Sequence, residues 1–299
     1  MKHSLNATIV ILAIFLITQI FGLYLIGESL NINYDDTGTI ILEHDSTTIG
    51  ERPDLQGYQS FIYLVVAVII GTILILILMK YQQIKLWKLW FFIAVFLAMS
   101  ISLGVILNPL LAMGIAIILA IVKITKRNVI THNLTEILMY SGIAVLLVPI
   151  FNLKWVIILL LTISVYDAYA VWKSKHMIKM AQFQAKSEVF AGLMIPYKRK
   201  KLELEIPSTP KLKSKKNTNA ILGGGDVAFS LIFSGVVMEW LVLNGVTLLN
   251  AFLQASIIGV ITTISLLTLF MIAKKDKFYP AMPIITLGCL IGLGIILIL

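Results

Sequence analysis

Long runs of apolar residues separated by short polar segments dominate the chain. A helix of roughly 20 apolar residues crosses the bilayer core, and nine runs reach or approach that length. They cover residues 6–27, 60–79, 89–107, 109–122, 135–150, 154–172, 219–238, 251–272 and 281–299. We interpret the first run as a retained span rather than a signal peptide, because no small-residue cleavage site follows it. The pattern therefore predicts an all-α polytopic membrane protein with nine transmembrane helices.

The basic residues lie mainly in alternate loops of this arrangement. Most of the 24 Lys and Arg follow the second, fourth, sixth and eighth runs, and the loop at 173–218 is especially rich in them. Cytoplasmic loops carry the excess of Lys and Arg, so we expect a cytoplasmic N-terminus and an extracytoplasmic C-terminus. The acidic loop at 28–57 then faces outward, and its segment IILEHDSTTIG can form short strands. The basic loop faces anionic lipid headgroups.

The composition narrows the possible functions. Hydrophobic residues make up 59% of the chain and charged residues 13%, about half the usual charged share of a soluble domain. The net charge of +9 is explained by cytoplasmic loops, so no nucleic-acid partner is expected. The single cysteine lies inside the last run and excludes a disulfide framework. The four histidines lie outside or at the edges of the runs, which argues against a Ser–His intramembrane protease. We expect no metal and no other cofactor.

Two acidic residues lie well inside predicted spans. These are Asp167 in the sixth and Asp226 in the seventh, whereas Glu136 and Glu239 lie at span ends, where we expect water. A carboxylate at the centre of a span costs roughly 2.5–3.5 kcal/mol on insertion scales. Intramembrane ionisable residues are therefore functional candidates.

The two aspartates lie at matching depths. Asp167 precedes Lys173 by six residues, and Asp226 follows Asn219 by seven, which places both about 9–10 Å inside the cytoplasmic boundary at the rise of an α-helix. Consecutive antiparallel spans can bring them face to face. Two adjacent carboxyl groups share a proton, so one can take a proton from water while the other protonates a peptide carbonyl. This is the chemistry of an aspartyl protease.

Two further motifs support a site at this depth. Three glycines directly precede Asp226 and allow close approach of neighbouring backbones. Pro280 and Pro283 open the last run, which also enters from the cytoplasmic side. Proline is common in a first helical turn, but an extended stretch here would line the cleft between the two acids.

Together these motifs resemble the presenilin and signal peptide peptidase family of GxGD intramembrane aspartyl proteases. The motifs are Tyr166-Asp167, Gly223-x-Gly225-Asp226 and Pro280-Ala281-Met282, and the stretch YDAYAVWKSKHMIKMA at 166–181 is similar to archaeal members. The resemblance covers the whole chain, 1–299, as one membrane-embedded protease domain. Within it, residues 1–172 hold the first six spans and 219–299 the last three.

The resemblance implies a catalytic pair formed by Asp167 and Asp226. It also implies that further motif positions shape the active site: Tyr166, Gly223, Gly225, Pro280, Ala281 and Met282. The family motif reads Pro-Ala-Leu, so the methionine at 282 is a departure, although it is similar to leucine in volume and more flexible.

The expected partners follow from the same resemblance. Family members cleave single-span transmembrane helices or signal peptides in the bilayer, and such a helix must unwind locally. We expect the substrate to pair as a strand with the segment Leu202, Glu203, Leu204, Glu205 and Ile206. No obligatory partner subunit is expected, because the loops are short, and the oligomeric state stays open. The protein is expected in the cell membrane as an integral, multi-pass protein of archaeal type.

Other functions remain open on the residues alone. A proton- or cation-coupled transporter or a leak channel would use two membrane aspartates, but would leave the glycine and proline motifs unexplained. A prepilin-type peptidase also uses an aspartate with GxGD, but lacks the C-terminal proline motif.

Overall fold

The structure is a computed structural model that describes residues 5–55, 57–125, 128–174, 183, 187, 189–196, 219–273 and 279–299. Nine helices of 15 residues or more lie in this part of the chain. They are α1 (Leu5–Glu28), α2 (Tyr58–Lys80), α3 (Ile84–Gly104), α4 (Pro109–Thr125), α5 (Val129–Leu147), α6 (Leu153–Tyr169), α8 (Gly224–Leu243), α9 (Leu248–Ile272) and α10 (Met282–Ile296).

Each predicted apolar run overlaps one of these helices, so the helical membrane architecture is confirmed. Among the described residues, seven helices are long and apolar enough to cross a membrane, whereas α4 and α10 are shorter. At the rise of an α-helix, their 17 and 15 residues correspond to about 25 and 22 Å. The count of nine spans and the orientation of the termini stay predictions.

The structure corrects the predicted start of the seventh span. Residues Asn219–Gly223 form strand β4, which pairs antiparallel with β3 (Gly192–Pro196), and α8 begins only at Gly224. Gly223 is the N-cap of α8 and has an extended backbone (φ −62°, ψ 145°). Hydrophobicity alone does not separate a buried strand from the helix that follows it. The strand β3 lies inside the basic loop at 173–218.

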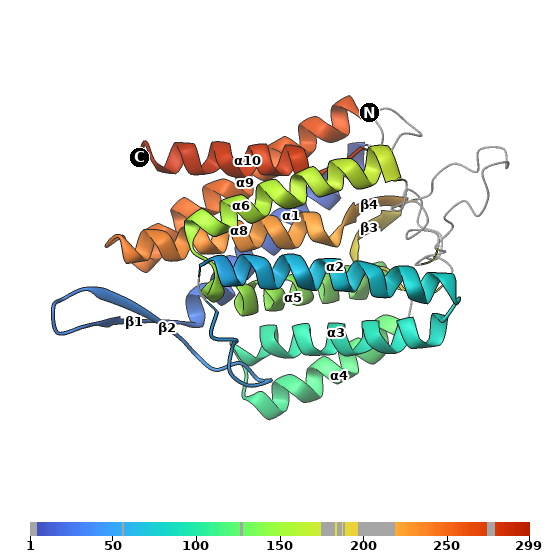
Figure 1. Cartoon of the computed structure of the whole chain (residues 1–299), viewed down its shortest axis with the longest axis horizontal. Coiled ribbons are helices and arrows are strands. Elements are labelled where there is room, and N and C mark those ends of the chain that lie inside the picture. The colour runs from blue at the N-terminus through green and yellow to red at the C-terminus, as the bar shows by residue number, and fades with distance from the viewer. Residues whose placement is uncertain are drawn as a thin grey trace.

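A second hairpin connects the first two helices. Strands β1 (Leu30–Tyr34) and β2 (Ile40–His44) pair antiparallel, which confirms the short strands expected in this acidic loop. The two sheets lie at opposite ends of the helix bundle (Figure 1). The sheet of β3 and β4 adjoins the first turn of α8, whereas β2 packs near its other end.

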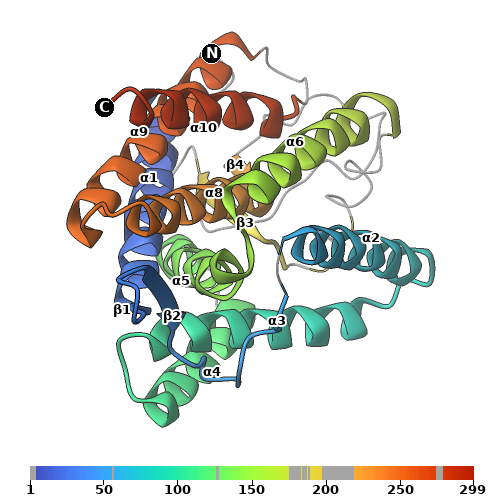
Figure 2. The ribbon, with the colours of Figure 1, turned by 60° about the vertical axis from the view of Figure 1, so that its left-hand side comes forward.

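Helix α8 lies at the centre of the bundle. It packs against α1, α5, α6, α9 and α10, which surround it in Figure 2. In its most apolar window 78% of the residues are buried, compared with 6% in α2. The residues at the start of α8 are therefore held from several sides, while α2 keeps most of its apolar surface for lipid.

Helices α3 and α5 approach each other closely at Gly142. A Cβ atom on this glycine would lie 1.8 Å from the carbonyl oxygen of Ala98 and 3.1 Å from the amide nitrogen of Ser102. Both atoms belong to the backbone of α3, so a side-chain rotation cannot relieve the contact. The two helices can pack at this distance only with glycine at this position.

We expect Gly142→Ala to destabilise the protein by about 1–3 kcal/mol or more, the usual cost of overpacking a buried site. The measurement is the thermal unfolding temperature of the purified protein in detergent. Gly114→Ala in α4 is the matched control, because a Cβ there meets no atom within 4 Å. Equal unfolding temperatures for the two variants would contradict the close packing of α3 and α5.

Candidate active site

Asp167 lies near the end of α6 and contacts the start of α10. Its Oδ2 accepts a hydrogen bond from the backbone N–H of Met282 at 3.2 Å, and the backbone amide of Ala281 bonds the same carboxyl group. Three residues after Asp167 the backbone widens into a π-helical segment, Ala170–Ser174. Such single π turns are frequent at functional sites.

The sequence of the α10 N-terminus explains why it accepts a carboxyl group. The first N–H groups of a helix have no partner inside the helix and carry partial positive charge. Here Pro283 has no N–H, and the N–H groups of Ile284 and Ile285 both bond the carbonyl of Ala281 at 3.1 Å. The amides of Ala281 and Met282 are left, and these two face Asp167. The Pro-Ala-Met motif thus contacts Asp167 through its backbone.

Asp226 is the third residue of α8. Its carboxyl group bonds the backbone N–H of the N-cap residue, Gly223, the reciprocal half of a capping box. A Cβ on Gly223 would lie 3.0 Å from Asp226 Oδ2, so glycine leaves room for this carboxyl group. A Cβ on Gly225 would meet only Phe229 of the same helix, at 3.7 Å.

The two aspartates approach each other from packed helices. Helix α6 packs against α8, and the carboxyl groups of Asp167 and Asp226 are close enough to interact electrostatically. Both residues are partly exposed at the protein surface. The arrangement can share a proton between two carboxyl groups beside a water molecule.

The remaining predicted positions differ in their surroundings. Pro280 and Met282 are buried and Ala281 is partly buried beside Asp167, whereas the Tyr166 side chain is 47% exposed on α6. The predicted substrate strand, residues 202–206, lies outside the described residues.

The middle glycine of the motif, Gly224, is the position with the least space, and the motif did not identify it. A Cβ there would lie 2.4 Å from the hydroxyl oxygen of Tyr140 and 3.0 Å from its ring. Tyr140 projects from α5 and is 2% exposed. A tyrosine in an apolar run carries no sequence signal of a site, because its partner is 84 residues away along the chain.

The prediction that Glu136 lies near water is wrong. Helix α5 begins at Val129, before the predicted start at 135, and places Glu136 fully buried inside the bundle. Its Oε1 lies 2.5 Å from Lys123 Nζ, and its Oε2 accepts hydrogen bonds from the Tyr140 hydroxyl and, at 3.0 Å, from the N–H of Gly192. The sequence signal for this burial was a Lys and a Glu of opposite charge at the facing ends of consecutive runs joined by one short loop, Lys123 and Glu136.

The family described as "Signal-peptide peptidase, presenilin aspartyl protease" matches residues 9–299. The chain belongs to this family.

One solved structure with the same fold is a presenilin family intramembrane aspartate protease. It matches with a TM-score of 0.57 and 14% sequence identity, over 96% of this chain and 94% of that chain. No curated protein matches the chain. Membership of the presenilin and signal peptide peptidase family confirms the resemblance in the motifs and identifies an integral membrane protein of the aspartyl protease class. The archaeal type of the chain stays a prediction.

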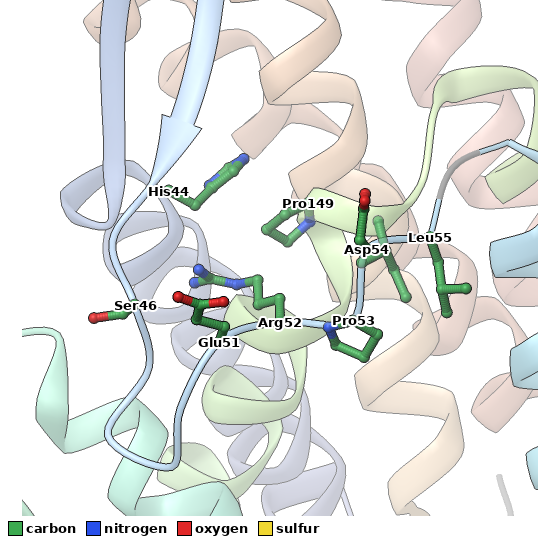
Figure 3. Close-up of a pocket in the computed structure, with 9 residues that line it drawn as sticks. His44, Ser46, Glu51, Arg52, Pro53, Asp54, Leu55 and Pro149 are labelled. Carbon is green, nitrogen blue, oxygen red and sulfur yellow. The ribbon is translucent and has the colours of Figure 1, made fainter.

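At the opposite end of α8 from Asp226, a cavity of about 410 Å³ lies beneath the loop that follows β2 (Figure 3). It is lined by His44, Ser46, Glu51, Arg52, Pro53, Asp54, Leu55, Pro149 and Ile150. Nearby, His44 Nε2 lies 3.6 Å from Glu239 Oε1. Glu239 is 7% exposed, so the prediction that it lies near water is also wrong. The β-hairpin and its loop cover this end of the helix.

His44 makes the folded state sensitive to acid. Burial and the nearby positive charge of Arg52 lower the pKa of His44 from its usual 6.5 to about 4. The Glu239 carboxyl group can form an ion pair only with a protonated ring, whereas burial and Arg52 favour the neutral one. Between pH 6.5 and 4 the unfolded chain therefore binds a proton that the folded chain does not.

We expect the stability of the protein to fall as the pH decreases from 6.5 to 4, with a contribution from His44 on the order of 3 kcal/mol. In His44→Gln this contribution is absent, so the unfolding temperature should fall less steeply over the same range. Thermal unfolding in detergent at pH 7.5, 6, 5 and 4.5 measures both slopes. Parallel slopes in the two proteins would show that His44 is not the group responsible.

Proposed function

We propose that this protein hydrolyses peptide bonds within transmembrane helices or signal peptides, with Asp167 and Asp226 as its catalytic pair. The observation that carries the proposal is the approach of these two carboxyl groups from packed helices α6 and α8. Each is held by backbone N–H groups at the start of a helix. Family membership supplies the reaction class.

The chemistry needs only the two carboxyl groups and water. One carboxylate takes a proton from a water molecule, whose oxygen attacks the peptide carbonyl carbon, while the other carboxyl group gives its proton to the carbonyl oxygen. The resulting gem-diol collapses when the C–N bond breaks and the leaving nitrogen receives a proton. The amides of Ala281, Met282 and Gly223 fix the carboxyl orientations during these steps.

The proposed substrate is a single-span helix that unwinds locally at the cleavage site. An intact helix keeps its peptide groups in hydrogen bonds, so the scissile bond must leave the helix before water can attack it. The glycines before Asp226 provide the room for an extended backbone. Pairing of the substrate with residues 202–206, and activity without partner subunits, are parts of this proposal.

We expect Asp167→Asn and Asp226→Asn each to reduce cleavage on the order of a thousandfold or more, because neither amide can exchange the proton. The assay uses the purified protein in liposomes with a synthetic single-span helical peptide, and mass spectrometry locates the cut. Asp36→Asn, in the exposed β-hairpin, is the matched control. Turnover retained in either membrane variant would contradict the catalytic pair. Proton-coupled ion flux that depends on both acids, without cleavage, would favour a transporter.

We expect Met282→Leu to retain cleavage and to change stability by less than about 1.5 kcal/mol, as volume-conserving apolar substitutions do. The contact to Asp167 uses the backbone N–H of residue 282, which the substitution keeps. The side chain is 3% exposed, so the products should be compared by mass spectrometry for shifted cleavage positions. A large loss of kcat would show that the methionine side chain itself serves the reaction.

A further inference from the structure

A buried ionic cluster lies beside the glycines that precede Asp226. At its centre is Glu136, which is completely buried and contacts Lys123, Tyr140 and the N–H of Gly192. Lys123 Nζ also donates to Thr135 Oγ1 at 3.0 Å. A buried ion pair contributes little to net stability compared with apolar residues of similar volume, so stability alone does not account for the cluster.

The cluster reaches the turn before Asp226 directly, through Tyr140. The Tyr140 hydroxyl donates to Glu136, which fixes the position of the ring. The oxygen of the same hydroxyl would lie only 2.4 Å from a Cβ atom on Gly224. It therefore occupies the space that a side chain at this position would need. Tyr140 is also close enough to Asp226 for the two side chains to interact electrostatically.

The cluster reaches the same turn a second time, through the β-sheet. On α5, Glu136 accepts the N–H of Gly192, and His132 Nε2 lies 2.9 Å from the carbonyl oxygen of Gly192. Asn133 bonds both backbone groups of Met194, at 2.9 and 3.0 Å. Helix α5 therefore holds β3 along its length.

Strand β3 in turn holds the chain that enters α8. Gly192 is the register partner of Gly223, the N-cap residue whose N–H bonds the Asp226 carboxyl group. Glu136 thus contacts both groups that reach the turn before Asp226, namely Gly192 of β3 and Tyr140 of α5. A displacement of either would move the turn that carries Asp226.

We propose that Tyr140 and Glu136 are positioning residues that set the backbone of residues 223–226 and so the orientation of Asp226 toward Asp167. The inference rests on the proposed catalytic pair and deepens it. Among the described residues, the hydrogen bonds of the Tyr140 and Glu136 side chains go to neighbours other than the carboxyl groups of Asp167 and Asp226. The action of Tyr140 and Glu136 is to keep the Asp226 carboxyl group in its productive orientation, where small displacements cost large factors in rate.

The pairing of Tyr140 with Gly224 supplies a sharp test. In Gly224→Ala the new methyl group meets the Tyr140 hydroxyl, and Tyr140→Phe removes that oxygen while keeping the ring. The ring carbons at 3.0 Å remain tight, so the relief is partial. We expect Gly224→Ala to reduce kcat by a larger factor in the native background than in Tyr140→Phe.

The experiment measures kcat and KM for a synthetic single-span peptide with the full chain in liposomes. Tyr140→Phe is expected to lower kcat about 10- to 100-fold with little change in KM, and Glu136→Gln to do the same. Binding of a hydroxyethylene peptide isostere should weaken together with kcat, because it mimics the transition state. Ser141→Ala is the matched control, since it removes a buried hydroxyl of α5 with no hydrogen-bond partner among the described residues.

A second measurement reads the positioning without catalysis. Hydrogen exchange at residues 219–226 should accelerate in Tyr140→Phe and stay unchanged in Ser141→Ala. Hydrogen exchange also separates the positioning role from the catalytic pair, because it does not require cleavage. A wild-type protein that cleaves no substrate would overturn the catalytic pair, whereas the exchange rates at 219–226 would still test the positioning role. If Glu136→Gln fails to fold, Tyr140→Phe carries the test.

Three results would overturn the positioning role. The first is a well-folded Tyr140→Phe with wild-type kcat and wild-type exchange at 219–226. The second is a loss of kcat that only follows a general loss of thermal stability. The third is strict additivity of the Gly224→Ala and Tyr140→Phe effects on kcat, which would show that the two positions do not act through their contact.

Discussion

The site depends on how an apolar helix bundle satisfies two carboxyl groups at membrane depth. Such groups need hydrogen-bond donors, and side-chain donors are scarce in this environment. The protein uses backbone N–H groups at helix starts, which are unpaired in any helix. Asp167 takes those at the start of α10, and Asp226 takes the N–H of the residue that caps α8. The location of both helix starts is therefore part of the site.

The need for free backbone N–H groups beside the two carboxyl groups explains why α8 and α10 begin where they do. Helix α8 cannot begin earlier, because the preceding residues pair with β3 as a strand. Helix α10 begins at Met282, so the amides of Ala281 and Met282 have no partner inside the helix and face Asp167. Non-helical backbone at membrane depth is tolerated where protein surrounds it, and here α5 and β3 surround the turn before Asp226.

Helix α8 connects this end of the molecule with the other. Within the turn that follows Asp226, Gln19 of α1 donates to the carbonyl of Val227 at 3.1 Å and to the Ser230 hydroxyl at 2.9 Å. At the far end Glu239 Oε1 lies 3.6 Å from Nε2 of His44 in β2. Polar contacts with α1 thus anchor the start of the helix, and contacts with five neighbouring helices hold the rest of it. A rigid central helix suits a site whose two acids come from different helices.

The sequence by itself determined the helical membrane architecture, the family and the identity of the two membrane aspartates as candidates. These follow from local properties, namely the length of apolar runs, the cost of a charge in lipid, and short motifs. Only the tertiary structure decided that residues 219–223 form a strand, that Glu136 and Glu239 are buried, and that Tyr140 occupies the space beside Gly224. Each of these depends on a partner distant in the chain, such as Gly192 for Gly223 or Lys123 for Glu136. A hydrophobicity pattern records the environment of a residue but not the identity of the side chain that it meets.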